Sequence, residues 1–573
     1  MKSRDGLLVK FKRQFFKKFK KNEWQEDTMK VLGLNGWIER GHDGGASLII
    51  DGKLISAVEE ERFINLRHAY DKMPIESIKW ILNEAKITLD DIDSINFGWD
   101  YPSLYKMLNK EFMTKEEFSK HLFGTEKYAN KINYVPHHLA HSYSAFYPSN
   151  YKKALSLVID GQGEIMGTSI YQAERDKEMT LLMESKVSLG YFYSAITKHV
   201  GFHVGEEGKT MGLASYGKPI FASELSKYIN QNGGKLWCVF EIEKVSKDEE
   251  DVTINKWTEI LSTILPVKQG KIISIEDSIM DYANLARSAQ EVLENILTGL
   301  ITYYYNQTKI GNVVISGGVG LNCPSTSAIE MLPFIKDVFV QPAANDGGIS
   351  LGAAIKGALD LKDKVKIEMI PYTGSSYNND EILNELQNYK VKYNFEKSIE
   401  KKIAQLLAQD KIVANFQGGF EYGPRALGNR SLLASPKTKE MWAKMNILKG
   451  REVWRPLAPA VLFDKQAKFF SYKKFSPFMT KNCYVLEDKI EKLWAITHVD
   501  GTARIQSVTK RYNSRFYKII KEYYKLTKIP VVINTSFNVK AQPIVRTPKE
   551  AIESAMKMNL DYLSIGNYLV NLK

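Results

Sequence analysis

Two histidines four residues apart, His137 and His141, are the first residues of this 573-residue chain that could do chemistry together. On a helix, both imidazoles would project from one face, one turn apart. Asp160 follows at the end of an apolar, β-branched run that is typical of a buried strand. Two histidines and one carboxylate on neighbouring elements form a ligand set suited to a divalent or iron-type metal, with positions left open for a substrate.

A lone pair of histidines at this spacing more often belongs to a helix start that is capped and packed. The residue after His137 is His138 and not glutamate, so the general base of the HExxH metalloproteases is absent from the motif. Both interpretations of the pair therefore stay open, and the elements around it must decide between them.

Length and composition set the broad class. A chain of 573 residues is too long for one hydrophobic core, which predicts about three units. No run of about 18 apolar residues and no secretory signal is visible. The three cysteines are scattered, which favours a reducing compartment without a disulfide framework. We expect a cytoplasmic, multidomain enzyme with no transmembrane segment.

The net charge of +13 is uneven along the chain. Residues 1–28 hold nine basic and four acidic residues, with phenylalanines at helical spacing. Such a basic extension can make peripheral contact with an anionic membrane, or be a poorly ordered tail, or precede a start at Met29. Elsewhere no basic stripe is interleaved with aromatic residues, so no nucleic acid is expected as a partner. The oligomeric state is left open.

The pattern of strands and turns repeats. Strands are predicted over residues 31–35, 46–50 and 53–58, joined by a glycine-containing turn and an Asp-Gly hairpin, and followed by a helix over 75–88. The scheme returns with strands at 154–159 and 165–172, and strands at 312–315 and 338–342 run through glycine turns into helices. Such turns let backbone N–H groups approach a phosphate. The duplication predicts an α/β fold of the actin, sugar-kinase and Hsp70 type (ASKHA).

A second α/β unit is predicted after a break at residues 362–380. It begins with a helix over 380–388, a strand over 391–395, a helix over 398–409 and a strand over 412–416. Beyond these, arginine, lysine, serine and asparagine gather in short turns bounded by glycine and proline, which fits polyphosphate binding. Surface ion pairing is the alternative, but the apolar neighbours of Arg425 and Arg455 favour a phosphate site.

Motifs along the whole chain carry a family resemblance. From Met29 to the C-terminus, and in this order, stand VLGLNGW, EEERF, HHLAHSYSAFYPS, DGQGE, GKTMGLASYG, ISGGVGLN, QPAANDGG, EYGPRALGNRSLL, REVWRPLAPAVL, HVDGTARIQSV and NTSFN. Together they resemble the O-carbamoyltransferases of the NodU/CmcH type. The resemblance implies an ASKHA-type carbamoyl-transfer domain over 29–365 and a C-terminal YrdC-like domain over 366–573. The second domain would make carbamoyl-adenylate from carbamoyl phosphate and ATP, and the first would move the carbamoyl group to a hydroxyl.

The resemblance also implies roles for individual residues. The metal, Fe(II) or another divalent ion, would be held by His137, His141, Asp160 and Asp346. His42 would be the general base, and Lys209 would act beside the nucleotide. The N-terminal nucleotide site would use Gly317, Gly318 and Asn322. ATP, with Mg²⁺, and carbamoyl phosphate would meet Arg425, Lys449, Arg455, Arg504 and Ser536.

Two alternatives and one open question remain at this point. A tRNA threonylcarbamoylation enzyme would need a tRNA surface, and a non-catalytic nucleotide-binding protein of the actin or Hsp70 type would lack the C-terminal unit. A free carbamoyl-adenylate is labile in water, so an enclosed passage between the two sites is expected. We expect a small-molecule hydroxyl acceptor, and its identity is the open question: an aminoglycoside or other natural product of antibiotic or secondary metabolism, a Nod-type oligosaccharide, or a surface glycan.

Overall fold

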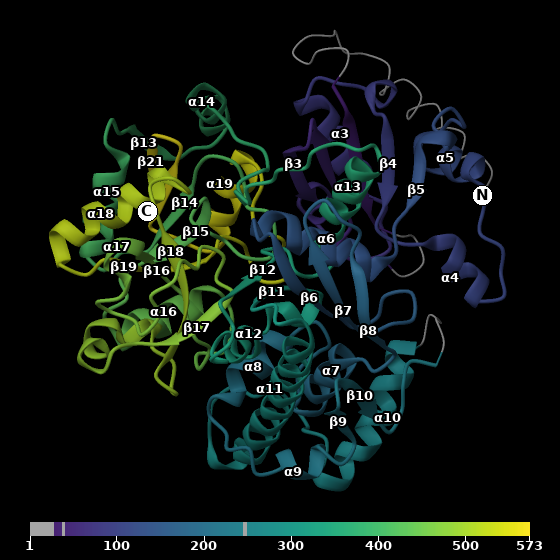
Figure 1. Cartoon of the computed structure of the whole chain (residues 1–573). Coiled ribbons are helices and arrows are strands. Elements are labelled where there is room, and N and C mark those ends of the chain that lie inside the picture. The colour runs from purple at the N-terminus through teal and green to yellow at the C-terminus, as the bar shows by residue number, and fades with distance from the viewer. Residues whose placement is uncertain (1–27, 37–40, 244–248) are drawn as a thin grey trace.

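The computed structural model describes residues 28–36, 41–243 and 249–573. The predicted basic extension lies outside the described residues except for Thr28. In Figure 1 the C-terminal part stands to one side of the two sheets of the N-terminal part, and the chain between them passes through the middle of the molecule.

The first sheet contains five strands in the order β3-β2-β1-β4-β5. These are β1 (Lys30–Asn35), β2 (Gly45–Ile50), β3 (Lys53–Glu59), β4 (Ser94–Phe97) and β5 (Ile132–Tyr134). The first three form an antiparallel meander, whereas β4 and β5 run parallel to β1. The predicted hairpin between β2 and β3 turns at Asp51 and Gly52, which both adopt the positive φ that a tight turn of this kind requires.

The second sheet repeats the first. Its strands are β6 (Lys153–Ile159), β7 (Thr168–Glu174), β8 (Thr180–Ser185), β11 (Asn312–Ser316) and β12 (Asp337–Val340), in the order β12-β11-β6-β7-β8. Again the first three are antiparallel, and the last two are parallel to the first. The same order and the same directions in both sheets confirm the predicted α/β fold with a duplicated ASKHA-type N-terminal part.

Two helices lie between the sheets and hold them together. Helix α13 (Ile349–Asp360) packs on β1, β2 and β4 of the first sheet, and α6 (His137–Ser149) packs on β6 and β11 of the second. The helices also pack on each other at very close range. A Cβ atom on Gly352 would lie 1.7 Å from the carbonyl oxygen of Ala140, so only glycine permits this approach of α13 to α6.

Further helices cover the outer surfaces. The segment between β8 and β11 contributes a helical group around the buried side chain of Trp257, made of α7 (Leu189–His199), α8 (Glu207–Ala214), α10 (Glu249–Ile264) and α11 (Met280–Thr308). On the first sheet, α3 (Ile75–Glu84) is shorter than the predicted helix over 75–88. It ends early because Lys86 turns to a positive φ of 55° and cannot continue the helix.

The C-terminal part is built on one mixed sheet of nine strands, in the order β13-β21-β20-β14-β15-β19-β16-β18-β17. The strands are β13 (Lys392–Phe395), β14 (Val413–Phe416), β15 (Arg430–Ala434), β16 (Pro459–Leu462), β17 (Lys481–Tyr484), β18 (Thr502–Val508), β19 (Val531–Ser536), β20 (Tyr562–Ile565) and β21 (Tyr568–Asn571). The predicted first four elements of this unit are α14 (Asn379–Gln387), β13, α15 (Ile399–Ala408) and β14, each within two residues of its expected ends.

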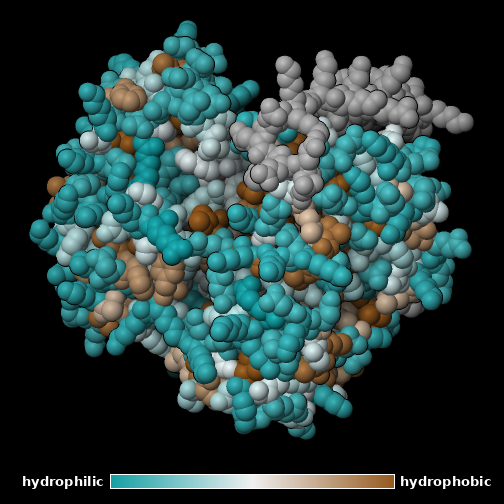
Figure 2. All heavy atoms as spheres, turned by 45° about the horizontal axis from the view of Figure 1, so that its top comes forward, coloured by the Kyte–Doolittle hydropathy of each residue, from teal (hydrophilic) through white to brown (hydrophobic). Residues whose placement is uncertain are grey.

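The described part of the chain contains no helix that is both long and apolar enough to cross a membrane. On the face drawn in Figure 2, most residues are hydrophilic, and the hydrophobic ones are scattered in small groups.

The glycine between α13 and α6 makes a first test. Gly352→Ala should lower the free energy of unfolding by roughly 1–3 kcal/mol, because the added methyl group forces the two helices apart. Alanine is a better helix former than glycine, so helix propensity alone would predict that Gly352→Ala raises the free energy of unfolding. Thermal unfolding, followed by circular dichroism, measures the effect.

Gly208→Ala in α8 is the matched control, since a Cβ atom there meets nothing within 4 Å. It should leave the unfolding midpoint unchanged or raise it slightly. Equal midpoints for the two variants would contradict the close-packing argument.

Candidate active site

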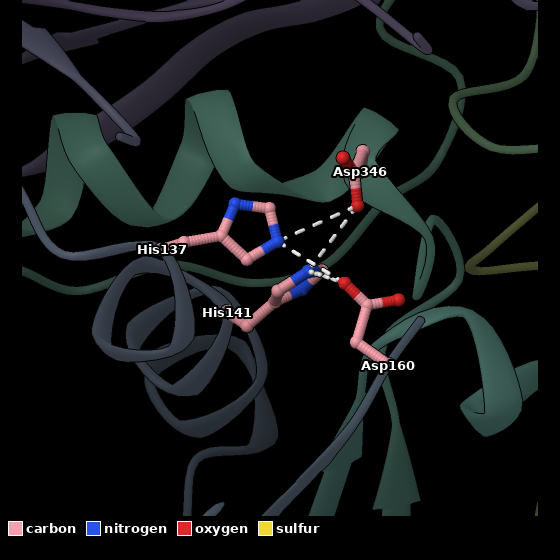
Figure 3. A group of neighbouring side chains, drawn as sticks. All are labelled: His137, His141, Asp160 and Asp346. Carbon is pink, nitrogen blue, oxygen red and sulfur yellow. Dashed lines mark hydrogen bonds and ion pairs between the residues drawn. The ribbon is translucent and has the colours of Figure 1, made fainter. Parts of the chain in front are cut away.

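Four side chains from three parts of the N-terminal fold converge on one point (Figure 3). His137 and His141 lie one turn apart at the start of α6, Asp160 follows β6, and Asp346 precedes α13. The His137 Nε2 atom lies 3.1 Å from Asp160 Oδ2 and 3.6 Å from Asp346 Oδ1. The corresponding distances from His141 Nε2 are 3.6 and 3.5 Å. All four side chains are buried.

Hydrogen bonds between side chains and the backbone fix the positions of these residues. The carboxylate of Glu164 accepts a hydrogen bond from the His137 backbone N–H at 2.9 Å, which satisfies one of the free N–H groups at the start of α6. The Gly318 N–H donates to Asp160 Oδ1 at 3.0 Å, so that Oδ2 faces the histidines. Gly317 makes this possible with a positive φ of 86°, and a Cβ atom there would lie 2.2 Å from the Ile159 carbonyl oxygen.

The donor set fits a metal ion. Two imidazole nitrogens and two carboxylate oxygens suit a divalent transition metal. The buried Nε2 atom of His141 has no hydrogen-bond partner among the described residues, although it points at both carboxylates. Burial acts to lower the pKa of His141, but Asp160 and Asp346 outweigh it and raise the pKa to about 9. Without a cation, the imidazole therefore holds a proton where a metal would bind.

The neighbouring histidine on α6 behaves differently. The Nδ1 atom of the His138 imidazole shares a hydrogen bond of 2.7 Å with the Ser169 hydroxyl. Burial lowers the pKa of His138 to about 3, so its ring is neutral. Of the three histidines at the start of α6, only His137 and His141 belong to the cluster.

A second polar group lies beside the cluster and centres on the buried Asp43. One oxygen of Asp43 accepts hydrogen bonds from His42 at 3.2 Å and from the Asn345 amide at 2.8 Å. The other oxygen accepts one from His68 at 2.8 Å. Desolvation by the surrounding protein acts to lower the pKa of His42, although its side chain is 46% exposed, but the charges of Asp346, Asp43 and Asp160 raise the pKa to about 10. A cation at the cluster would offset part of this effect.

One cavity of about 350 Å³ joins this group to the C-terminal part. At one end it is lined by Asp43, His68 and Asn345. At the other end it is lined by a set of five basic residues, which we call the basic set: Arg425, Lys449, Arg451, Arg455 and Arg504. Four of the five were predicted as phosphate ligands. The expected enclosed passage thus has a counterpart in a cavity that both parts of the chain line.

The basic set is crowded with like charge. Burial and the neighbouring arginines lower the pKa of both Arg425 and Arg451 to about 9. Burial and the same neighbours hold the pKa of Lys449 well below its usual value. The buried Arg451 Nη2 and Arg504 Nε atoms have no hydrogen-bond partner among the described residues. A bound polyanion would supply both the missing acceptors and the missing negative charge.

Two of the predicted residues, Lys449 and Lys209, have protein partners at this end. The Lys449 ammonium donates to the Ser536 carbonyl oxygen at 2.7 Å and to Asn538 Oδ1 at 2.6 Å, which ties it to the turn after β19. Lys209 forms ion pairs with Glu206 at 2.7 Å and Glu452 at 3.0 Å, and so bridges α8 to the C-terminal part.

Arg451 was not among the predicted site residues. Its position in the sequence could have indicated a role in phosphate binding. Arg451 lies between Lys449 and Arg455 in one short turn, so its side chain must lie close to the other two cations.

The predicted nucleotide residues of the N-terminal part have other partners in this structure. The Gly318 N–H is used by Asp160, as described above. The Asn322 side chain caps α12 (Cys323–Glu330) by accepting from the Ser325 N–H at 3.1 Å, and it also bonds Gln290. The role of Gly317, Gly318 and Asn322 in nucleotide binding stays a prediction.

Comparisons with known proteins agree on one family. Residues 30–355 match the family model described as Carbamoyltransferase N-terminus, and residues 404–572 match Carbamoyltransferase C-terminus. Nodulation protein NolNO of Sinorhizobium fredii is 33% identical over 95% of this chain and 82% of its own length. Nodulation protein U of Rhizobium fredii is 26% identical over 89% of this chain and 90% of its own length. Among solved structures, full-length HypF aligns with 59% of this chain and 56% of its own, at 15% identity and a TM-score of 0.31.

The histidine cluster makes the second test. His141→Ala should lose most of the bound metal, because it removes one of four converging donors and leaves two buried carboxylates close together. Metal content of the purified protein, measured by elemental analysis, gives the result.

His138→Ala is the control from the same helix turn, and it should keep the metal content of the wild type. Equal metal in wild type and His141→Ala, or loss of metal in both variants, would exclude the assigned ligand set.

Proposed function

The chain belongs to the carbamoyltransferase family, and we propose that it is an ATP-dependent O-carbamoyltransferase with two linked reaction sites. As a family enzyme it is not the non-catalytic nucleotide-binding protein that the N-terminal fold alone would allow. The one observation that carries the two-site proposal is the cavity shared by the Asp43 group and the basic set.

The first step is the formation of carbamoyl-adenylate in the C-terminal part, over residues 366–573. Carbamoyl phosphate, ATP and water yield carbamoyl-adenylate, pyrophosphate and phosphate. All three phosphorus-containing products are anions, and their charge suits the five crowded cations of the basic set, of which Lys449 is buried and the four arginines are half-buried. In this step Arg425, Lys449, Arg455, Arg504 and Ser536 hold the phosphates, together with Arg451. ATP brings Mg²⁺ with it.

The second step is transfer of the carbamoyl group in the N-terminal part, over residues 29–365. An acceptor hydroxyl attacks the carbamoyl carbon, and AMP leaves with the electron pair of the broken bond. Fe(II) or another divalent ion held by His137, His141, Asp160 and Asp346 would act as a Lewis acid. The proton of the hydroxyl goes to an imidazole bonded to Asp43, where His42 is the base that the family resemblance implies.

A cavity that both parts of the chain line gives a reason for two sites in one chain. Carbamoyl-adenylate would be hydrolysed if it passed through bulk water, and a common cavity keeps it enclosed between formation and use. Lys209 would stand beside this path, since it lines the cavity and pairs with Glu452 of the C-terminal part.

The acceptor that we propose is a small-molecule hydroxyl on a sugar or natural product, and the compartment is the cytoplasm. The motifs VLGLNGW and FGWDYP also resemble those of the tobramycin carbamoyltransferase, whereas the relatives compared above are nodulation proteins. Aminoglycosides and oligosaccharides are therefore both acceptors to test. Beyond residues 1–28, the sequence has no concentrated basic stretch that would favour the tRNA-modification alternative.

Point variants at the two ends of the cavity should separate the steps. Arg455→Ala removes a charged contact to phosphate and should cut pyrophosphate release by about a hundredfold, or about 2.7 kcal/mol. Asp43→Asn should leave acceptor-free pyrophosphate release nearly intact and slow carbamoyl transfer by roughly 10²–10⁴, because the imidazoles lose their carboxylate partner. Pyrophosphate release and carbamoylated product are measured in parallel.

Arg511→Ala serves as the matched arginine control, since the Arg511 side chain is 75% exposed and pairs with Glu368 at the surface. It should behave as wild type in both assays. The two-site proposal would be wrong if Asp43→Asn abolished pyrophosphate release while Arg455→Ala spared it.

A further inference from the structure

One segment of the C-terminal part is buried inside the N-terminal part. It runs over residues 420–425, in the connection between β14 and β15. Phe420 and Tyr422 are both fully buried, and each belongs to a hydrophobic cluster that contains residues of the first sheet. The segment ends at Arg425, a member of the basic set. A short stretch of chain therefore joins the basic set to the interior of the N-terminal part.

The side chain of Tyr422 reaches the backbone next to a candidate metal ligand. Its hydroxyl donates to the carbonyl oxygen of Gly347 at 2.6 Å, and Gly347 directly follows Asp346 in the sequence. Burial raises the pKa of Tyr422, so the phenol keeps the proton that this hydrogen bond uses. The Tyr422 backbone N–H donates to the Pro371 carbonyl oxygen at 2.6 Å, which anchors the residue in the C-terminal part.

The turn that carries Asp346 has little rigidity of its own. Gly347 and Gly348 follow the aspartate, and glycine has more backbone freedom than any other residue. A larger residue cannot stiffen the turn at position 348, because a Cβ atom there would lie 2.2 Å from the Ala343 carbonyl oxygen. Contacts from outside the turn must therefore fix its conformation.

Two side chains make such contacts, one from each part of the chain. The Asn35 amide, at the end of β1, donates to the carbonyl oxygen of Asp346 at 2.9 Å. The Tyr422 hydroxyl holds the next carbonyl group, that of Gly347. These two bonds fix consecutive peptide groups, and so they set the direction in which the Asp346 carboxylate points. In Figure 3 this carboxylate points at the imidazoles of His137 and His141.

Other contacts keep the buried segment in this position. Arg62 of the N-terminal part is itself buried, and its guanidinium donates to the carbonyl oxygens of Gly423 at 2.9 Å and Ile544 at 3.3 Å. The Glu59 carboxylate accepts a hydrogen bond from the Gly423 N–H at 3.3 Å. Both backbone groups of the residue after Tyr422 are thus bonded to the N-terminal part.

We propose that Tyr422 is a positioning residue for Asp346, so that the metal centre reaches its full affinity only when both parts of the chain are docked. The inference rests on the metal centre of the proposed function. The hydroxyl acts through the peptide group of Gly347 and is not itself one of the four converging donors. Loss of a residue that holds a metal ligand in place typically weakens metal binding by about 10- to 100-fold.

The shared segment has a consequence for the assembly of the enzyme. Tyr422 and Arg425 are three residues apart, so docking of the segment brings the hydroxyl and one cation of the basic set into place together. The transfer centre would therefore be complete only where the adenylate-forming part is also in position.

The test removes one hydroxyl group from the full-length protein. Tyr422→Phe keeps the buried ring and deletes the donor to Gly347. Tyr523→Phe is the matched control, because Tyr523 is also fully buried and its hydroxyl bonds Ser435 at 3.1 Å within the C-terminal part. Metal is first removed with a chelator. The affinity for Co²⁺ is then measured by competition with a chromophoric chelator, together with the visible spectrum of bound Co²⁺, the unfolding midpoint without metal, and pyrophosphate release without acceptor.

Tyr422→Phe should weaken Co²⁺ binding by about 10- to 100-fold and alter the visible spectrum of bound Co²⁺, because Asp346 loses its fixed direction. Tyr523→Phe should keep the affinity and the spectrum of the wild type. Without metal, the two unfolding midpoints should fall by similar amounts, since each variant loses one buried hydrogen bond. Pyrophosphate release by both variants should stay within a few-fold of wild type. A merely structural role of Tyr422 would not change the Co²⁺ affinity and spectrum alone.

Four other outcomes would overturn the inference. Equal Co²⁺ affinity in wild type and Tyr422→Phe would show that the hydroxyl does not position Asp346. An equal loss of affinity in Tyr422→Phe and Tyr523→Phe would be a general effect of lower stability. If Tyr422→Phe loses pyrophosphate release and keeps its Co²⁺ affinity, the hydroxyl serves Arg425 instead. If the wild type binds no Co²⁺, the proposed metal centre itself fails, and the role of Tyr422 fails with it.

Discussion

The close approach of α6 and α13 is the contact on which the candidate metal centre depends. The two helices bridge two sheets that repeat one topology, and each carries part of the ligand set at its N-terminal end. With a side chain at Gly352, the helices would move apart, and the distance from His141 to Asp346 would grow with them. The packing of small residues in the interior therefore sets a geometry that four polar side chains could not maintain alone, because their own unpaired charges oppose burial.

The two ends of the cavity are complementary in charge. One end gathers carboxylates and imidazoles, and the other gathers five cations whose pKa values fall because they repel one another. Neither arrangement is a low-energy one for an empty site. The buried cluster beside the acidic end is suited to a metal and the basic end to phosphates, so ligands would relieve the electrostatic cost at both places. This distribution of charge lowers the stability of the free protein and favours the binding of a metal at one site and of phosphates at the other.

Much of this could be predicted from the sequence, and the limits have physical reasons. The meander, its Asp-Gly hairpin and its repetition follow from period-two patterns and turn residues, and the structure has them within a few residues. Spacing along one helix put His137 and His141 on the same face. Spacing could not show that Gly318 bonds Asp160, that Asn322 caps a helix, or that His68 shares Asp43 with His42. Those partners are far apart in sequence, or they depend on a left-handed backbone conformation, as at Gly317 and His68, that the local sequence does not predict.

The loop over residues 65–71 links the chemistry of the two ends. Arg67 and His68 are adjacent, and both line the cavity. Arg67 is close enough to the basic set that its charge contributes to the lowered pKa of Arg425, Lys449 and Arg455. His68 instead bonds Asp43 at the other end. In an extended strand, neighbouring side chains point to opposite faces of a sheet, whereas the left-handed residues of this loop let two neighbours face one cavity. Because Arg67 and His68 line the same cavity, this strained loop contributes to its wall on both the basic and the acidic side.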